Sequence, residues 1–265
     1  MRAFLFIGLW LLALSASAVS QPDPFPQVAE AYLVEIDSRT VWERQSGKRL
    51  PPASLTKLMT ALLVLEQDKL KETVQVSQAA SLETGSRLGL KAGERLQVED
   101  LLAATMLQSA NDACHALADH IGGSETAFVQ RMNRRAQELG LHDTRFRNAC
   151  GHDANGHYST AADLVRLARE LLKHPQVIPL ASRPSSTIAT RDGKQYPLRN
   201  KNALVGRYDG ALGLKTGYTA QAGTCLVALA RRGEHEVLLV MLHGKDRWWD
   251  AADILDLAFD HALAH

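Results

Sequence analysis

The sequence predicts an α+β fold, in which an antiparallel β-sheet is flanked by helices and adjoined by a helical subdomain. Strand-like segments lie near both ends of the 265-residue chain, whereas the middle carries apolar residues at helical spacing. Strands and helices do not alternate one by one, as they do in parallel βαβ folds. The two ends are therefore expected to build a single sheet.

The first residues are typical of a signal peptide. Arg2 is followed by the apolar run "AFLFIGLWLLAL" and then by an A-x-A cleavage site, Ala16-Ser17-Ala18. The run is short for a membrane span, and no later segment is apolar enough to be one. We predict a signal peptide at 1–18, a Pro-rich lead-in at 19–27, and no stable membrane anchor after cleavage. The mature chain would be exported to the periplasm or another extracytoplasmic cell-wall space.

Residues 28–265 are predicted to form one domain. The sheet is expected from about 28–53 and 187–247, the helical region from about 54–186, and the last helix from about 247–263. Within the second sheet region, Gly-rich turns separate "STIAT", "GKQYPLRN", "GALGLKTGYT", "GTCLVALARRG" and "HEVLLVMLHG". The first long helix is expected to run from about Ser54 to Asp68.

Charge and cysteine content exclude several classes of function. The formal net charge is +1 and like charges form no block, so no nucleic-acid partner is expected. Cys114, Cys150 and Cys225 are scattered and lack C-x-x-C spacing, which argues against a zinc site. Histidines also lack metal-binding spacing, so no metal and no cofactor is predicted. Export would permit one disulfide bond, but the scattering favours buried free thiols.

The stretch "PASLTKLMTA" places Ser54 three residues before Lys57, at the start of an apolar helical run. A serine at this point is ordinarily a helix N-cap, and the lysine ordinarily faces water. S-x-x-K also arises by chance in a chain of this length. The alternative is a nucleophile with its base, and that interpretation requires partners elsewhere in the chain.

Two further motifs supply those partners. Ser109-Ala110-Asn111 is an S-x-N at the junction of two predicted helices, and Lys215-Thr216-Gly217 is a K-T-G on a predicted strand. S-x-N is common by chance, whereas K-T-G is rare. Serine β-lactamases and penicillin-binding proteins carry these three motifs in this order.

The chain resembles the low-molecular-mass penicillin-binding proteins, which are D-alanyl-D-alanine carboxypeptidases and endopeptidases of the serine β-lactamase-like superfamily. The resemblance runs from about Ala29 to the C-terminus and includes "SANDACHALADHIGG", "FVQRMNRRAQELGLHDTRFRN" and "DGALGLKTGYTAQAGTCLVALA". One departure is "RNACGHDANGHYST", where the family usually has Asn-Pro-x-Gly-Leu. Ala149 and His152 differ from that pattern.

Ser54 and Lys57 are the predicted nucleophile and base. A serine hydroxyl is a weak nucleophile at neutral pH and requires a base within hydrogen-bond reach, which helical spacing provides. Lys57 must be neutral to accept a proton, and burial together with the nearby cation Lys215 would favour the neutral form. The resemblance implies that Ser109 relays a proton to the leaving amine.

The resemblance assigns the remaining residues to substrate binding. Asn111 would contact the substrate backbone, and Lys215 with Thr216 would bind its terminal carboxylate. Gly217 would let the substrate approach the strand closely, as an added edge strand. The backbone N–H of Tyr218 and that of the nucleophile would form the oxyanion hole.

The resemblance implies a serine carboxypeptidase that removes the terminal D-alanine from peptidoglycan stem pentapeptides, with β-lactams as covalent inhibitors. The alternative is a D-alanyl endopeptidase that cleaves peptidoglycan cross-links, since Lys215 would serve either substrate. A β-lactamase is less favoured because the chain has no Glu-x-x-Leu-Asn stretch for rapid deacylation. An inactive cell-wall binding protein is less favoured because the catalytic residue types are all retained.

Overall fold

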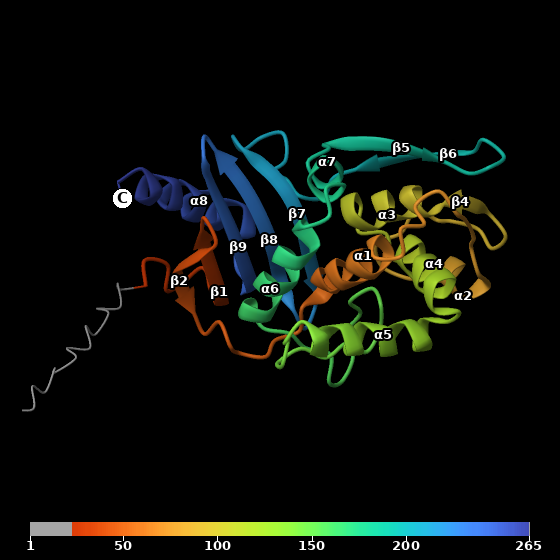
Figure 1. The fold of residues 1–265 in the computed structure, drawn as a ribbon, viewed down its shortest axis with the longest axis horizontal. Helices are drawn as coiled ribbons and strands as arrows, with labels where there is room; N and C mark the ends of the chain where they lie inside the picture. Colours follow the sequence, from red (N-terminus) through yellow and green to blue (C-terminus); the bar gives the residue numbers. More distant parts are fainter. Residues whose placement is uncertain (1–22, 265) are drawn as a thin grey trace, which may run out of the picture.

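The computed structural model describes residues 23–264, so the predicted signal peptide and the start of the lead-in lie outside the described residues. Its centre is a five-stranded antiparallel sheet with the strand order β2-β1-β9-β8-β7. The strands are β1 (Ala29–Ile36), β2 (Arg39–Arg44), β7 (Ala211–Thr219), β8 (Gly223–Arg232) and β9 (His235–Gly244). Strands from the two ends of the chain pair directly, as Figure 1 shows. The predicted α+β class and the sheet built from both ends are confirmed.

All of the described helices except the last one lie in the intervening chain. The helices are the 3₁₀ turn η1 (Ala53–Thr56), α1 (Lys57–Leu65), α2 (Gln78–Ser81), α3 (Val98–Leu107), α4 (Asn111–Gly122), α5 (Glu125–Glu138), α6 (Ala161–Leu172) and α7 (Val177–Ala181), with α8 (Arg247–Ala264) following the sheet. Two short strands, β3 (Thr73–Gln75) and β4 (Arg95–Gln97), pair inside this region and were not expected. The first helix is also shorter than predicted and begins as a 3₁₀ turn.

Both faces of the main sheet are covered (Figure 1). On β9, Val237, Leu239 and Met241 pack with α8, while Leu238, Val240 and Leu242 belong to the larger core with the other helices. None of these six side chains is exposed. Double coverage explains why this strand reads as a continuous apolar run and not as an alternation.

The expectation that residues 187–199 join the main sheet is wrong. β5 (Ser185–Ala189) and β6 (Gln195–Arg199) form a separate two-stranded sheet. Only one side of this hairpin is buried, through Ile188, Tyr196 and Leu198. The strands in the middle of the main sheet are buried on both faces, so a hairpin with one exposed side does not fit there.

The described part of the lead-in is docked on the domain. Phe25 packs edge-to-face against Trp42, with ring centroids 6.0 Å apart. Asp23 accepts a hydrogen bond from Arg44 at 3.2 Å and another from Tyr32. Across residues 23–264, none of the helices combines the length and apolar character that a membrane span requires.

Two of the three cysteines are not free thiols, which corrects the prediction. Cys114 on α4 and Cys150 in the loop before α6 form a disulfide with a Cα–Cα distance of 5.9 Å. They lie 36 residues apart in the sequence, and only the packing of α4 against this loop brings them together. Cys225 is buried and unbridged, as predicted.

Candidate active site

The predicted nucleophile and base are in contact. Lys57 Nζ lies 3.1 Å from Ser54 Oγ at the junction of η1 and α1. Residues three apart nearly eclipse one another in a 3₁₀ turn, so the two side chains stack on one face. Ala53, just before the serine, has a φ of +48°, a conformation uncommon for a residue with a side chain. The contact between Ser54 and Lys57 is the first requirement of a nucleophile with its base.

Lys57 is fully buried, and its amine has three oxygens within hydrogen-bond distance. Besides Ser54, Asn111 Oδ1 accepts a hydrogen bond from it at 2.7 Å, and the Cys150 carbonyl accepts another. A neutral amine has two N–H groups and one lone pair. If those two oxygens take the two hydrogens, the lone pair is left for the Ser54 hydroxyl. The surroundings therefore orient Lys57 as a hydrogen-bond acceptor towards the serine.

Burial lowers the pKa of Lys57 to about 7. The carboxylate of Glu83 opposes this change in pKa, and the cation of Lys201 adds to it. A lysine with this pKa is partly neutral at physiological pH. Near neutral pH, a substantial fraction of Lys57 is therefore in the neutral form that can accept the Ser54 proton.

A second lysine–serine pair lies behind the first. Lys215 Nζ, on β7, donates to Ser109 Oγ at 2.9 Å and to the Thr216 carbonyl at 2.8 Å. Burial, and then the charge of Lys57, holds the pKa of Lys215 well below its ordinary value. Ser109 joins α3 to α4 with a φ of +58°, so its hydroxyl is held by a constrained backbone.

Asn111 is committed to contacts inside the protein. Its Oδ1 accepts from Lys57, and its Nδ2 donates to the Thr84 carbonyl at 2.6 Å. Its backbone N–H donates to the Ser86 carbonyl at 2.7 Å. The structure thus brings Asn111 to the base, while the substrate contact that the resemblance implies stays a prediction.

The two pairs lie at a cleft of about 470 Å³. It is lined by Ser54, Gly85, Ser86, Ser109, Lys201, Thr216, Gly217, Tyr218 and Arg247. Both serines reach this surface, whereas Lys57 and Lys215 lie beneath it with almost no exposed area. The cations that line the cleft are Lys201 and Arg247, so these two groups can meet an anionic substrate directly.

Gly217 packs closely against the turn that carries Ser54, while its role in the approach of the substrate stays a prediction. A Cβ at this position would lie 3.1 Å from Ala53 Cβ and 3.2 Å from the backbone nitrogen of Ser54. The missing side chain lets β7 pack closely against the turn that carries the nucleophile. The neighbouring Tyr218 has a side chain that is 66% exposed at the cleft.

Sequence reasoning missed the two cations of the cleft. Arg247 begins α8, and its Nη1 donates to the Gly217 carbonyl at 2.6 Å. Burial lowers the pKa of Arg247. Lys201 donates to Ser86 Oγ at 2.6 Å. Neither residue stands in one of the three catalytic motifs, and the fold brings both to the serines.

A carboxylate with two histidines lies next to the site. Glu83 contacts His115 at 2.6 Å and His152 at 2.8 Å. Burial would raise the pKa of Glu83, but hydrogen bonds from the two histidines outweigh it and lower the pKa to about 2. The unusual His152 thus joins its loop to the segment that holds Glu83. Within residues 23–264, no group of three or more His, Cys, Asp or Glu side chains is arranged so that it could hold a metal ion.

The sequence matches a known family. The model of the D-alanyl-D-alanine carboxypeptidase family of peptidases matches residues 16–246. The chain belongs to that family.

Curated relatives of this family share about a third of their residues with the chain. D-alanyl-D-alanine carboxypeptidase DacF of Bacillus subtilis is 35% identical, over 98% of this chain and 71% of the relative. DacC of Escherichia coli is 35% identical, over 89% of this chain and 62% of the relative. The chain therefore spans less than two thirds of the Escherichia coli protein.

Solved structures of related proteins superimpose closely on this chain. A Streptomyces DD-transpeptidase has a TM-score of 0.83 and 30% identity, covering 91% of this chain and all of the other. A penicillin-binding protein of Listeria monocytogenes, solved in an ampicillin-bound form, has a TM-score of 0.75 and 32% identity. It covers 90% of this chain and all of its own. The family resemblance and the fold predicted from the sequence are confirmed.

Proposed function

We propose that this chain is a serine-type D-alanyl-D-alanine carboxypeptidase that releases the terminal D-alanine of peptidoglycan stem pentapeptides. One observation carries the proposal: Lys57 Nζ lies 3.1 Å from Ser54 Oγ and is buried so that its pKa falls to about 7. A serine paired with a neutral amine is a competent nucleophile at neutral pH. Family membership and the names of the relatives support the choice of substrate.

The first step is acylation of the serine. Ser54 Oγ attacks the carbonyl carbon of the penultimate D-alanine, and the hydroxyl proton passes to Lys57 Nζ. The carbonyl oxygen becomes an oxyanion, which the backbone N–H groups of Ser54 and Tyr218 stabilise. The first of these donors begins a helix, where unpaired N–H groups favour negative charge.

The second step expels the terminal D-alanine. Its nitrogen accepts a proton from Ser109 Oγ as the C–N bond breaks, and the proton that Lys57 took from Ser54 is returned to Ser109, which Lys215 holds at 2.9 Å. Burial lowers the pKa of Lys215, so this lysine holds the Ser109 hydroxyl through a hydrogen bond and is not the source of the proton. Water then hydrolyses the Ser54 ester and regenerates the hydroxyl.

The substrate carboxylate lies against the cations of the cleft. Thr216, Lys201 and Arg247 line the surface, whereas Lys215 is directed to Ser109. We therefore assign direct carboxylate contact to Thr216 with Arg247 and Lys201. Lys215 acts through its hydrogen bond to Ser109. A cationic pocket suits the free carboxylate of a terminal D-alanine, the group that a carboxypeptidase binds.

Export to the extracytoplasmic cell-wall space is part of the proposal. The sequence of residues 1–18 supports it, and so does a disulfide, because such bonds persist in oxidising compartments. β-Lactam binding is supported by the ampicillin-bound Listeria relative. N-terminal sequencing of the exported protein checks the cleavage, and an intact residue 1 in that protein would rule out a cleaved signal peptide.

The substrate test compares two purified muropeptides. The mature protein is incubated with a monomeric pentapeptide and, separately, with a cross-linked dimer that lacks pentapeptide stems. Mass analysis should find free D-alanine and tetrapeptide from the monomer. Cleavage of the dimer with the monomer untouched would replace the carboxypeptidase by the endopeptidase.

Covalent capture tests the nucleophile independently of the natural substrate. Penicillin should add a stable acyl mass to the peptide that contains Ser54, and Ser54→Ala should abolish the adduct. An undiminished yield at the same peptide in Ser54→Ala would refute the assignment.

A further inference from the structure

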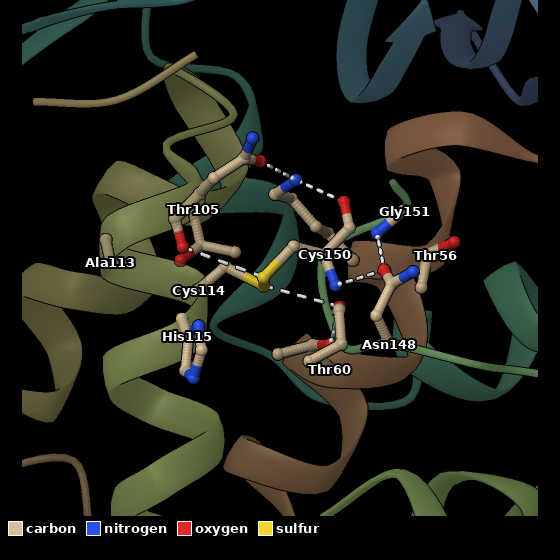
Figure 2. The surroundings of a disulfide bond; sticks show 12 residues. Thr56, Thr60, Thr105, Ala113, Cys114, His115, Asn148, Cys150 and Gly151 are labelled. Atoms are coloured by element: carbon tan, nitrogen blue, oxygen red, sulfur yellow. Dashed lines mark hydrogen bonds between the residues drawn. A yellow bond between two sulfur atoms is a disulfide. The ribbon is translucent and has the colours of Figure 1, made fainter. Parts of the chain in front are cut away.

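The Cys114–Cys150 disulfide (Figure 2) joins two segments of backbone. Each of these segments supplies an oxygen that accepts a hydrogen bond from the Lys57 amine. Cys114 follows Asn111 by three residues on α4, and the Asn111 side chain accepts from Lys57 at 2.7 Å. Cys150 supplies its own carbonyl as another acceptor for Lys57. The disulfide therefore connects the two segments that carry these acceptor oxygens. The third partner of the Lys57 amine is the Ser54 hydroxyl.

Other contacts of the Cys150 loop tie it to different elements. Thr60 Oγ1, on α1, donates to the Ala149 carbonyl at 2.7 Å, and the Ala149 N–H donates to Glu125, on α5, at 2.9 Å. Within the loop, Asn148 Oδ1 accepts from the Gly151 N–H at 2.7 Å. These hydrogen bonds fix the loop to α1 and α5. The covalent connection to α4 is the disulfide.

The connection to α4 matters because of how a neutral amine is oriented. Its two N–H groups point to Asn111 Oδ1 and to the Cys150 carbonyl, and its lone pair then points to Ser54. A change in the spacing of the two acceptors rotates or displaces the lone pair. Errors of about 1 Å in a catalytic group can reduce a rate roughly 100-fold.

We infer that the Cys114–Cys150 disulfide is a positioning device for Lys57, so that acylation of Ser54 depends on the oxidised state of this pair. The inference rests on the proposed function of Ser54 and Lys57. Neither cysteine is among the residues that line the cleft. Both act by holding an acceptor oxygen at a fixed place around the amine.

Reduction should loosen the site without unfolding the domain. Cys114 Sγ lies 3.3 Å from the Ala149 carbonyl and Cys150 Sγ lies 3.6 Å from the Asn111 carbonyl, so both thiols have acceptors within reach. The hydrogen bonds from Thr60 and Asn148 also remain. A loop released from α4 admits water to Lys57, and that water stabilises the ammonium form.

The test uses the mature protein in three states: oxidised, reduced with dithiothreitol, and as the double variant Cys114→Ala/Cys150→Ala, which retains the carbonyl at position 150. Thiol alkylation with mass analysis first counts the free thiols in each state. Acylation by a fluorescent penicillin is then measured against concentration and pH. This separates the maximum acylation rate from the initial dissociation constant.

We expect one free thiol in the oxidised protein, and a maximum acylation rate about 10- to 100-fold lower in the other two states. The acidic limb of the rate profile should move to higher pH, while the initial dissociation constant stays the same. That constant depends on the residues that line the cleft, and neither bridged cysteine is among them. Reoxidation should restore the rate, and Cys225→Ala, which removes the unbridged thiol, should acylate as the parent does.

Three results would overturn the inference. One is three free thiols in the oxidised protein. Another is a lower melting temperature with an unchanged acylation rate and pH profile, which would make the disulfide purely structural. The third is an equal loss of rate and of initial binding. Failure of the oxidised parent to acylate at all would instead reject the proposed function, and the inference with it.

Discussion

Gly217 packs directly against the backbone of Ser54, where a Cβ would lie 3.2 Å from the serine nitrogen. The close approach brings β7, the strand along which the substrate is proposed to lie, next to the turn that carries Ser54. It also sets the distance between the two proposed oxyanion donors, which are the N–H groups of Ser54 and Tyr218. The geometry of the oxyanion hole thus depends on a position without a side chain.

We predict that Gly217→Ala lowers the acylation rate by roughly 10-fold, because the strand or the turn must shift by a few tenths of an ångström. The melting temperature should change little. Gly47→Ala is the matched control, since a Cβ there meets nothing within 4 Å. Stopped-flow acylation with penicillin measures both variants. A Gly217→Ala rate equal to that of Gly47→Ala would contradict the prediction.

Gly151→Ala would create a more severe steric clash with the same turn. A Cβ there would lie 2.0 Å from the Ala53 carbonyl, and its φ of +90° disfavours a side chain. Gly151→Ala should therefore displace the turn before Ser54 and lower both the melting temperature and the acylation rate. Thermal unfolding beside the acylation assay shows whether both fall, and an unaltered melting temperature would argue against the clash.

The main sheet was predictable because its strands are covered on both faces. "CLVALA" and "VLLVML" are unbroken apolar runs, which is what a doubly covered strand requires. The hairpin of β5 and β6 was assigned to the same sheet because its segments also read as strands. Its residues alternate between buried and exposed instead. That alternation distinguishes a hairpin lying on helices from a central strand.

The pH dependence of acylation should follow Lys57. Its depressed pKa, about 7 in the folded chain, means that the base is protonated and inactive in acid and becomes neutral as the pH rises. The rate should therefore climb with pH and reach half its maximum near pH 7. A flat rate between pH values well below and well above this point would exclude Lys57 as the base.

Removing the charge of Glu83 should move this profile in a defined direction. Burial is the main cause of the low pKa of Lys57, and the Glu83 carboxylate partly opposes it. Glu83→Gln removes that opposition, so the pKa of Lys57 falls further and the acidic limb moves to lower pH. Glu99→Gln, an exposed glutamate paired with Lys71, serves as the control for charge alone. A shift to higher pH would contradict the prediction.

Lys57→Arg separates charge from proton acceptance. Guanidinium keeps the positive charge but cannot lose its proton in a protein. We predict that acylation falls by roughly 100-fold or more, in the range of a lost general base. Circular dichroism establishes that the variant is folded. Near-normal acylation by a folded variant would transfer the base role to Ser109 with Lys215.

Part of the site was predictable from motifs, because each motif is local. Ser54 and Lys57 lie on one turn, and their spacing alone implies contact. The Cys150 carbonyl could not be predicted, since any residue supplies a carbonyl and only the loop's path brings this one to Lys57. Arg247 was hidden for a similar reason: it is the first residue of a helix that otherwise packs on the sheet.

The final prediction concerns Arg247 as a ligand for the substrate carboxylate. Its guanidinium lines the cleft and is held by the Gly217 carbonyl at 2.6 Å, which directs it towards the end of β7. Arg247→Met should raise KM for a pentapeptide with a free terminal carboxylate by roughly 10- to 100-fold, the worth of one charged hydrogen bond. Arg232→Met is the matched control, because Arg232 stacks on Tyr208 and is not among the residues that line the cleft.

A pentapeptide amidated at its C-terminus makes the prediction specific. It lacks the charge that Arg247 would bind, so the parent should use it poorly and Arg247→Met should use it no worse than the parent does. Steady-state kinetics with both peptides give the comparison. If Arg247→Met loses equal activity on the two peptides, its effect comes from the Gly217 carbonyl and the shape of β7, and the carboxylate must bind to Thr216 and Lys201 instead.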